Sequence, residues 1–387
     1  MERIVKQNRC ARCCFVERFS ALAVMVSVCV LALLPAGCQR KMKPEEIFNE
    51  QKSGVVLIMN AYYYELTMPN GERLYFTGVD EMNGGFTGLT NEKAEVLQNR
   101  SVLNGTGFFI SHKGDILTNR HVVAPTVDKT LVKQNYNALL RNYGAYLTGL
   151  QQQMSEKYEV IRQYATEHAY YDDYGNLYTD MSDNDMLTLS QEAENLRQQY
   201  REAEAMKQGI VNNLLSGDFT VRCIAEYGIA YDNSYVGTEL KAMERDFMQR
   251  NPCVLVKESA APDTDLALLS LKSGKTPDDK FVFEIPGEDD AKTPEVNQTL
   301  YMIGYNAGII LANTKKGVAA QLTSGTVTQT PDGDRLLYSI PTMQGSSGSP
   351  IVDAYGRVVA VNFAKMADSD NFNFGVPLNK VRKFLKE

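Results

Sequence analysis

The alternation of apolar and polar positions predicts a β-rich start to the folded part of the chain. Residues 54–66 form an apolar run with several tyrosines, which is typical of a first strand. Residues 67–104 are rich in Gly, Asn and Glu, and we expect a long surface loop there. Two short apolar runs follow, 105–110 and 116–123, and the polar stretch between them predicts a hairpin turn at Gly114.

The pattern becomes helical after residue 127. Apolar side chains recur at alternating spacings of four and three residues in two segments, which favours two α-helices with coiled-coil-like stripes. The two stripes are Tyr136, Leu139, Tyr143, Tyr146 and Leu150, and then Leu189, Ala193, Leu196, Tyr200 and Ala203. We therefore expect residues 127–218 to be an inserted helical hairpin whose stripes pack as its seam. The alternative is that the stripes form a partner-binding or homo-oligomerising surface.

Strand-like runs return at Phe219 and continue to Phe363, separated by turn signals such as Asp332-Gly333. Many short strands with frequent turns indicate an antiparallel barrel or sandwich. A short amphipathic helix is predicted over residues 379–386. The expected fold class is therefore mostly β, with the helical hairpin inserted into it.

The first residues have the pattern of an export signal. A basic segment is followed by an apolar run from Phe19 to Leu34 and by the small residues before Cys38. This end resembles a bacterial lipobox, which implies a lipoprotein signal peptide over residues 1–37, lipid on Cys38 and a polar tether over residues 38–53. The alternative is an uncleaved transmembrane anchor, because the apolar run is close to the minimum spanning length.

Composition narrows the function further. The net charge of -7 and the absence of a Lys/Arg-rich block in the body of the chain argue against nucleic-acid binding. Beyond the signal and Cys38, the chain holds only Cys223 and Cys253. An even pair of cysteines in an oxidising compartment predicts a disulfide between them, and two buried free thiols are the alternative.

Three separated segments carry candidate chemistry. Ser347 lies between two glycines in Gly345-Ser346-Ser347-Gly348-Ser349-Pro350, a turn that can aim backbone N–H groups at one point. His121 follows the run Leu117-Thr118-Asn119-Arg120. Asp265 directly precedes the apolar run 266–269, which favours it over its neighbour Asp263 as a buried carboxylate.

These segments, with Gly105-Thr106-Gly107, resemble trypsin-like bacterial serine proteases over residues 54–126 and 219–387. The similarity extends to the HtrA/Deg type, here without a PDZ domain, and to glutamyl endopeptidases. It implies a chymotrypsin-like double β-barrel in which Ser347 is the nucleophile, His121 the general base and Asp265 its orienting carboxylate. The backbone N–H groups of Gly345 and Ser347 would form the oxyanion hole.

The same resemblance implies a substrate pocket at Thr342, Asn362 and Phe363. Thr342 matches a threonine of glutamyl endopeptidases, whereas Asn362 replaces their pocket histidine, which weakens a preference for glutamate. Ser349 stands where a second glycine is commoner, as it does in the glutamyl endopeptidases. Small or medium apolar side chains are therefore the favoured residues before the cleaved bond.

The main hypothesis is a serine endopeptidase of the bacterial cell envelope, lipid-anchored at Cys38 and facing the periplasm or cell exterior. It would cleave protein or peptide substrates, with protein quality control as one role, and we expect no cofactor, no metal and no nucleic-acid partner. The alternatives are a catalytically silent binding or scaffold lipoprotein and an esterase that uses the same residues.

Overall fold

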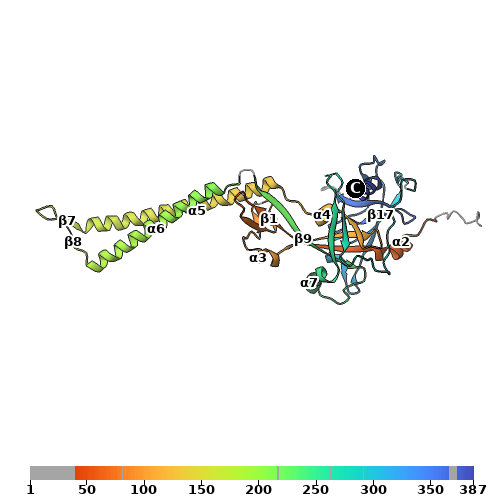
Figure 1. The fold of residues 1–387 in the computed structure, drawn as a ribbon, viewed down its shortest axis with the longest axis horizontal. Helices are drawn as coiled ribbons and strands as arrows, with labels where there is room; N and C mark the ends of the chain where they lie inside the picture. The colour runs from red at the N-terminus through yellow and green to blue at the C-terminus, as the bar shows by residue number, and fades with distance from the viewer. Residues whose placement is uncertain are drawn as a thin grey trace, which may run out of the picture.

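The computed structural model describes residues 40–80, 82, 84–215, 218–261, 263–290, 292–365 and 373–387. The predicted signal peptide over residues 1–37 and the lipidation site at Cys38 lie outside these residues. Two β-sheet bodies pack side by side, and a long helical hairpin projects from one of them (Figure 1). None of the helices in the described ranges combines the length and apolarity needed to cross a membrane.

The first body is a closed six-stranded antiparallel barrel. Its strands are β1 (Val55–Thr67), β5 (Ser101–Phe109), β6 (Asp115–Thr118), β11 (Ala267–Leu271), β10 (Pro252–Glu258) and β9 (Thr220–Tyr231). They pair in that order, and the pairing of β9 with β1 closes the ring. The ladder between β1 and β9 runs on past the barrel to the pair Thr67 and Thr220, and β2 (Arg73–Phe76) pairs with this extension.

The second body is a six-stranded sheet that curls until its edges meet. Its order is β15 (Gln321–Thr326), β12 (Thr299–Gly304), β17 (Pro350–Val352), β18 (Val358–Lys365), β19 (Asn373–Pro377) and β16 (Leu336–Tyr338). A bridge between Val327 and Tyr338 joins the two edge strands. The predicted fold class, a mostly β double barrel with a helical insertion, is therefore confirmed.

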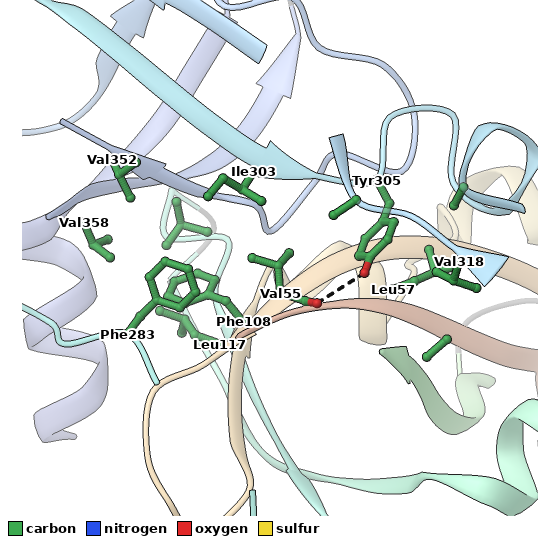
Figure 2. Packing of buried hydrophobic residues seen from close by; sticks show 14 of the residues in the cluster. Val55, Leu57, Phe108, Leu117, Phe283, Ile303, Tyr305, Val318, Val352 and Val358 are labelled. Carbon is green, nitrogen blue, oxygen red and sulfur yellow. Dashed lines mark hydrogen bonds between the residues drawn. The ribbon is translucent and has the colours of Figure 1, made fainter. Parts of the chain in front are cut away.

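The main hydrophobic core lies between the two barrels (Figure 2). Val55, Phe108 and Leu117 of the first barrel pack toward Ile303 and Val352 of the second, and all five are fully buried. Between the same two barrels, the Tyr305 hydroxyl donates to the backbone carbonyl of Val55 at 3.2 Å. Because burial of apolar surface is the main driving force of folding, this shared core fixes one barrel against the other.

The inserted hairpin consists of α5 (Lys129–Glu167) and α6 (Asp183–Asn213), joined by the small β-hairpin of β7 (Ala169–Tyr171) and β8 (Leu177–Thr179). Its buried face matches the predicted stripe only in part. Tyr136 of that stripe is buried on α5, as are Leu147 and Gln151 outside it, whereas Leu139, Tyr143 and Tyr146 of the stripe are exposed. A methyl group on Gly144 would lie at an ordinary van der Waals distance of 3.5 Å from Ile210 Cδ1, which places Gly144 on the face of α5 that contacts α6.

Two predicted loops contain regular structure. The tether predicted over residues 38–53 holds α2 (Pro44–Gln51) and the start of the 3-10 turn η1 (Lys52–Gly54), because Ile47 is fully buried in the core. The surface loop predicted over residues 67–104 holds β2, β3 (Gly78–Val79), β4 (Phe86–Thr87) and α3 (Lys93–Gln98). Local composition missed both segments, since their order comes from tertiary contacts.

Short helices complete the fold. They are α4 (Arg120–Val123), α7 (Leu240–Arg250), α8 (Ile309–Ala312) and the C-terminal α9 (Leu378–Lys386), and the small hairpin of β13 (Asn313–Thr314) and β14 (Gly317–Val318) follows α8. The predicted strand-like run over residues 116–123 therefore divides into β6 and α4. Helix α9 matches the predicted amphipathic segment, with Val381 and Phe384 buried.

The predicted disulfide between Cys223 and Cys253 is wrong, because both cysteines are free. The strand register gives the reason. Cys253 of β10 faces Tyr227 of β9, so Cys223 lies four residues farther along that strand. At about 3.3 Å per residue this separation is roughly 13 Å, well beyond the Cα–Cα distance that a disulfide spans.

Candidate active site

His121 lies in a short helical turn that the first barrel holds at its rim. Strand β6 ends at Thr118, Asn119 is the N-cap residue, and α4 carries His121 in its first turn. Asn60 of β1, fully buried, donates from Nδ2 to the carbonyls of Val122 at 2.9 Å and Val123 at 3.1 Å. Since these carbonyls immediately follow His121, the barrel wall fixes the backbone that carries the imidazole.

Asp265 holds His121 by two contacts. Its Oδ1 accepts a hydrogen bond from the His121 backbone N–H at 2.9 Å, and its Oδ2 contacts ring Nδ1. A carboxylate oxygen accepts, so Nδ1 is the donor and Nε2 remains free to take a proton. Asn119 donates from Nδ2 to the Asp265 carbonyl at 2.8 Å, which ties the two segments together again. The neighbouring Asp263 points elsewhere, because Lys380 binds it at 2.7 Å.

Ser347 sits in the glycine-rich turn of the second barrel, and strand β5 of the first barrel binds that turn. The Thr106 N–H donates to the Ser347 carbonyl at 2.8 Å, and Thr106 Oγ1 donates to the Gly345 carbonyl at 2.8 Å. Gly348 comes even closer, because a Cβ on it would lie 2.1 Å from the Thr106 carbonyl and 3.2 Å from the Asn119 nitrogen. Ser347 is therefore brought next to the segment that carries His121.

Two glycines shape the backbone of this turn. Gly345 and Gly348 both adopt positive φ, +98° and +88°, which glycine tolerates and other residues disfavour. Within the part of the chain that the structure describes, the N–H groups of Gly345 and Ser347 donate to no protein acceptor. These two free donors are the groups expected to form an oxyanion hole. The Ser347 hydroxyl and the His121 ring are likewise not hydrogen-bonded to each other among the described residues.

The predicted pocket residues are mostly engaged in internal contacts. The Thr342 hydroxyl donates to Asn373 Oδ1 at 2.7 Å, and Asn362 donates from Nδ2 to the Ser346 carbonyl at 2.9 Å while its Oδ1 accepts from the Tyr338 hydroxyl. Phe363 packs against the core between the barrels. Thr342 and Asn362 thus help to fix the backbone of the Ser347 turn and of the segment that leads into it. The polar groups of both side chains already have hydrogen-bond partners inside the protein.

Three positioning residues were missed at the level of sequence: Thr106, Asn119 and Asn60. Thr106 and Asn119 lie inside the Gly105-Thr106-Gly107 and Leu117–Val123 motifs, so the motifs contained them without revealing their contacts. Asn60 had a signal of its own, since a polar side chain in the middle of an apolar strand must find a buried partner. In the described ranges, no group of three or more His, Cys, Asp or Glu side chains is arranged to hold a metal ion.

A family model described as the trypsin-like peptidase domain matches residues 209–361, which include Asp265 and Ser347. This stretch of the chain is therefore similar to trypsin-like peptidase domains, and the double barrel and the His121–Asp265 contact agree with that similarity. No curated protein matches the chain.

Among solved structures, the chain is similar to the serine endoprotease from Yersinia pestis, at 13% sequence identity and a TM-score of 0.40. That similarity covers 89% of this chain and 66% of the Yersinia chain, so slightly less than two thirds of the latter is spanned.

Proposed function

We propose that the chain is a serine endopeptidase in which Ser347, His121 and Asp265 act as a catalytic triad. The observation that carries the proposal is the double contact of Asp265 with the backbone N–H and the Nδ1 of His121. This contact sets the imidazole tautomer and stabilises the imidazolium that forms when the ring takes a proton. The free N–H groups of Gly345 and Ser347 complete the set of parts that acyl transfer requires.

The reaction follows from these positions. His121 Nε2 takes the proton of the Ser347 hydroxyl as Oγ bonds to the scissile carbonyl carbon, and the carbonyl oxygen becomes an oxyanion held by the two backbone N–H groups. The tetrahedral intermediate collapses, and His121 donates its proton to the leaving amine. Water, deprotonated by the same imidazole, then attacks the acyl carbon, the bond to Ser347 Oγ breaks, and the imidazolium returns its proton to that oxygen, which releases the carboxylate product and restores Ser347.

Labelling with a fluorophosphonate probe tests the proposal on the full chain expressed in a bacterial host. We expect Ser347 to be labelled, and labelling to be lost in both Ser347→Ala and His121→Ala. Ser155→Ala, on the exposed surface of α5, is the matched control and should label like the unaltered protein. A folded chain that takes up no probe would instead support the scaffold hypothesis, and hydrolysis of esters but not of peptides would support an esterase.

The location and the substrates are further parts of the proposal. The signal-like segment and Cys38 favour a lipid-anchored protein of the bacterial envelope that cleaves extracytoplasmic proteins, including damaged ones. Lipid anchoring is tested by fractionation: Cys38→Ala should move the chain from the membrane fraction to the soluble fraction. If the variant stays in the membrane, the anchor is the apolar segment itself.

A further inference from the structure

The far end of the inserted hairpin is exposed to solvent and remote from both barrels (Figure 1). Helix α5 has 39 residues, so at about 1.5 Å per residue it is roughly 58 Å long. The β7–β8 hairpin forms its tip, and the two strands pair with each other. A structure of this length places the tip where a partner can reach it without entering the candidate active site.

The tip carries apolar side chains on both of its faces. Tyr170 pairs with Tyr178 across the hairpin, their rings stacked at 5.9 Å, and Tyr171 pairs with Leu177 on the opposite face. Tyr171 is 70% exposed, Leu177 62%, and Tyr174 in the turn 91%. A two-stranded hairpin is only marginally stable in water unless something packs against it. Tyrosine, the commonest of these exposed residues, is enriched in protein–protein interfaces. The side chains of this tip therefore form a surface that is apolar and uncovered within the chain.

The turn of this hairpin is nevertheless held in one shape. Asp172 accepts hydrogen bonds from the Tyr174 N–H at 2.9 Å and from the Asn176 N–H at 2.8 Å, and Gly175 supplies a positive φ of +82°. The hydrogen bonds from Asn176 and from the Tyr174 N–H also lower the pKa of Asp172. Because the turn is already ordered, it loses less conformational entropy when a partner binds, and this favours a role of the tip in binding.

The charge around the tip identifies the partner chemistry. Residues 163–196 contain no Lys or Arg and hold eight acidic residues: Glu167, Asp172, Asp173, Asp180, Asp183, Asp185, Glu192 and Glu194. Like charges repel, so the tip of a second copy and an anionic lipid surface are both disfavoured. A cationic partner is attracted, and its guanidinium groups can also stack on tyrosine rings. The same hairpin shows this contact internally, because the Arg197 guanidinium lies 4.9 Å from the Tyr158 ring centre.

We propose that the β7–β8 tip binds an arginine-rich segment of another protein, with its tyrosines as the contact surface and the surrounding carboxylates as the source of attraction. The exposed aromatic faces give the binding surface, and the one-sided charge gives its selectivity. This proposal stands on residues of the insertion and does not depend on the proposed peptidase activity.

Fluorescence anisotropy with three labelled peptides tests the tip: alternating arginine and serine, alternating lysine and serine, and alternating glutamate and serine. The full chain carrying Ser347→Ala is used so that no peptide is cleaved. We expect the arginine peptide to bind more tightly than the lysine peptide, the glutamate peptide not to bind, and binding to weaken from about 50 to about 500 mM salt. Replacing Tyr171, Tyr174 and Leu177 by Ala should weaken arginine-peptide binding about tenfold at unchanged net charge.

The control is Tyr146→Ala, which removes a 60% exposed tyrosine from the α5 surface far from the tip and should leave binding unchanged. Equal binding by the tip variant and its parent would overturn the proposal, since attraction would then come from charge alone. So would absence of arginine-peptide binding, self-association that the tip variant abolishes, or preferential binding to phosphatidylcholine–phosphatidylglycerol vesicles.

Discussion

Gly348 of the second barrel lies directly against Thr118 of the first, so closely that a Cβ on the glycine would sit 2.4 Å from Thr118 Oγ1. Thr118 is three residues before His121, and Gly348 follows Ser347. The contact joins the two halves of the candidate active site, because it leaves no space for a side chain between the turn that carries the serine and the strand that leads to the histidine.

Gly348→Ala should therefore disrupt the site. The added methyl group meets both the Thr106 carbonyl and Thr118, and alanine also disfavours the φ of +88°. We expect a stability loss of about 2–5 kcal/mol in urea unfolding and more than tenfold weaker fluorophosphonate labelling. Gly71→Ala is the matched control: its φ is +86°, yet nothing lies within 4 Å of the new methyl group, so only about 1 kcal/mol should be lost. Equal effects of the two substitutions would refute the packing argument.

Asp265→Asn should lower kcat/KM about ten-thousandfold with little change in fold. The asparagine oxygen can still accept from the His121 backbone N–H, but its amide would donate to ring Nδ1 and leave the proton on Nε2, where the base is needed. Peptide hydrolysis measures the effect. Asp263→Asn, which removes a carboxylate bound to Lys380, is the control and should change kcat/KM less than about threefold. A mild Asp265→Asn phenotype would exclude Asp265 from the triad.

Asn60→Ala should impair catalysis through the position of His121. The substitution removes both hydrogen bonds to the carbonyls of Val122 and Val123 and leaves those carbonyls less well held. We expect a stability loss of about 1–3 kcal/mol and a several-fold lower kcat at nearly unchanged KM.

Asn137→Ala is the matched comparison for Asn60→Ala. Asn137 is also buried, and its amide bonds both the N–H and the carbonyl of Leu215 at the base of the helical insertion. The two variants should lose similar stability, whereas only Asn60→Ala should lower kcat. If kcat falls equally in both, the effect reflects general destabilisation.

The two free cysteines should react slowly in the folded protein. Burial raises the pKa of both the Cys223 and the Cys253 thiol to about 12. At pH 8 only about one thiol in ten thousand is then ionised, against roughly a quarter for an ordinary cysteine. Alkylation followed by mass spectrometry at each residue should therefore be at least about a hundredfold slower in buffer than in urea, and faster as pH rises. A disulfide would show as no alkylation in urea without a reductant.

Local sequence patterns predicted more of the fold than of the contacts that position the candidate active-site residues. Strand β1 and the two long helices agree with the periodicity of the sequence, since a run of β-formers or a repeat of apolar positions acts over neighbouring residues. The buried face of α5 matches its predicted stripe only in part, because the position of the neighbouring helix and strands decides which of its side chains are covered. Helix α2 was missed since the burial of Ile47 depends on strands far away in the chain.

The sequence by itself determined the residue types and the order of the candidate chemistry: a histidine after an apolar strand, an aspartate before another, and a serine between two glycines. These features are local. Glycine readily adopts the backbone angles of the turn, and the residue type alone determines whether a side chain is a carboxylate or an imidazole. Only the tertiary structure decided what these groups touch. The contact of Asp265 with His121, the free state of Cys223 and Cys253, and the contact of Gly348 with Thr118 all depend on strand register and on the core between the barrels. Register and long-range packing minimise the free energy of the whole chain, and no short segment contains that information.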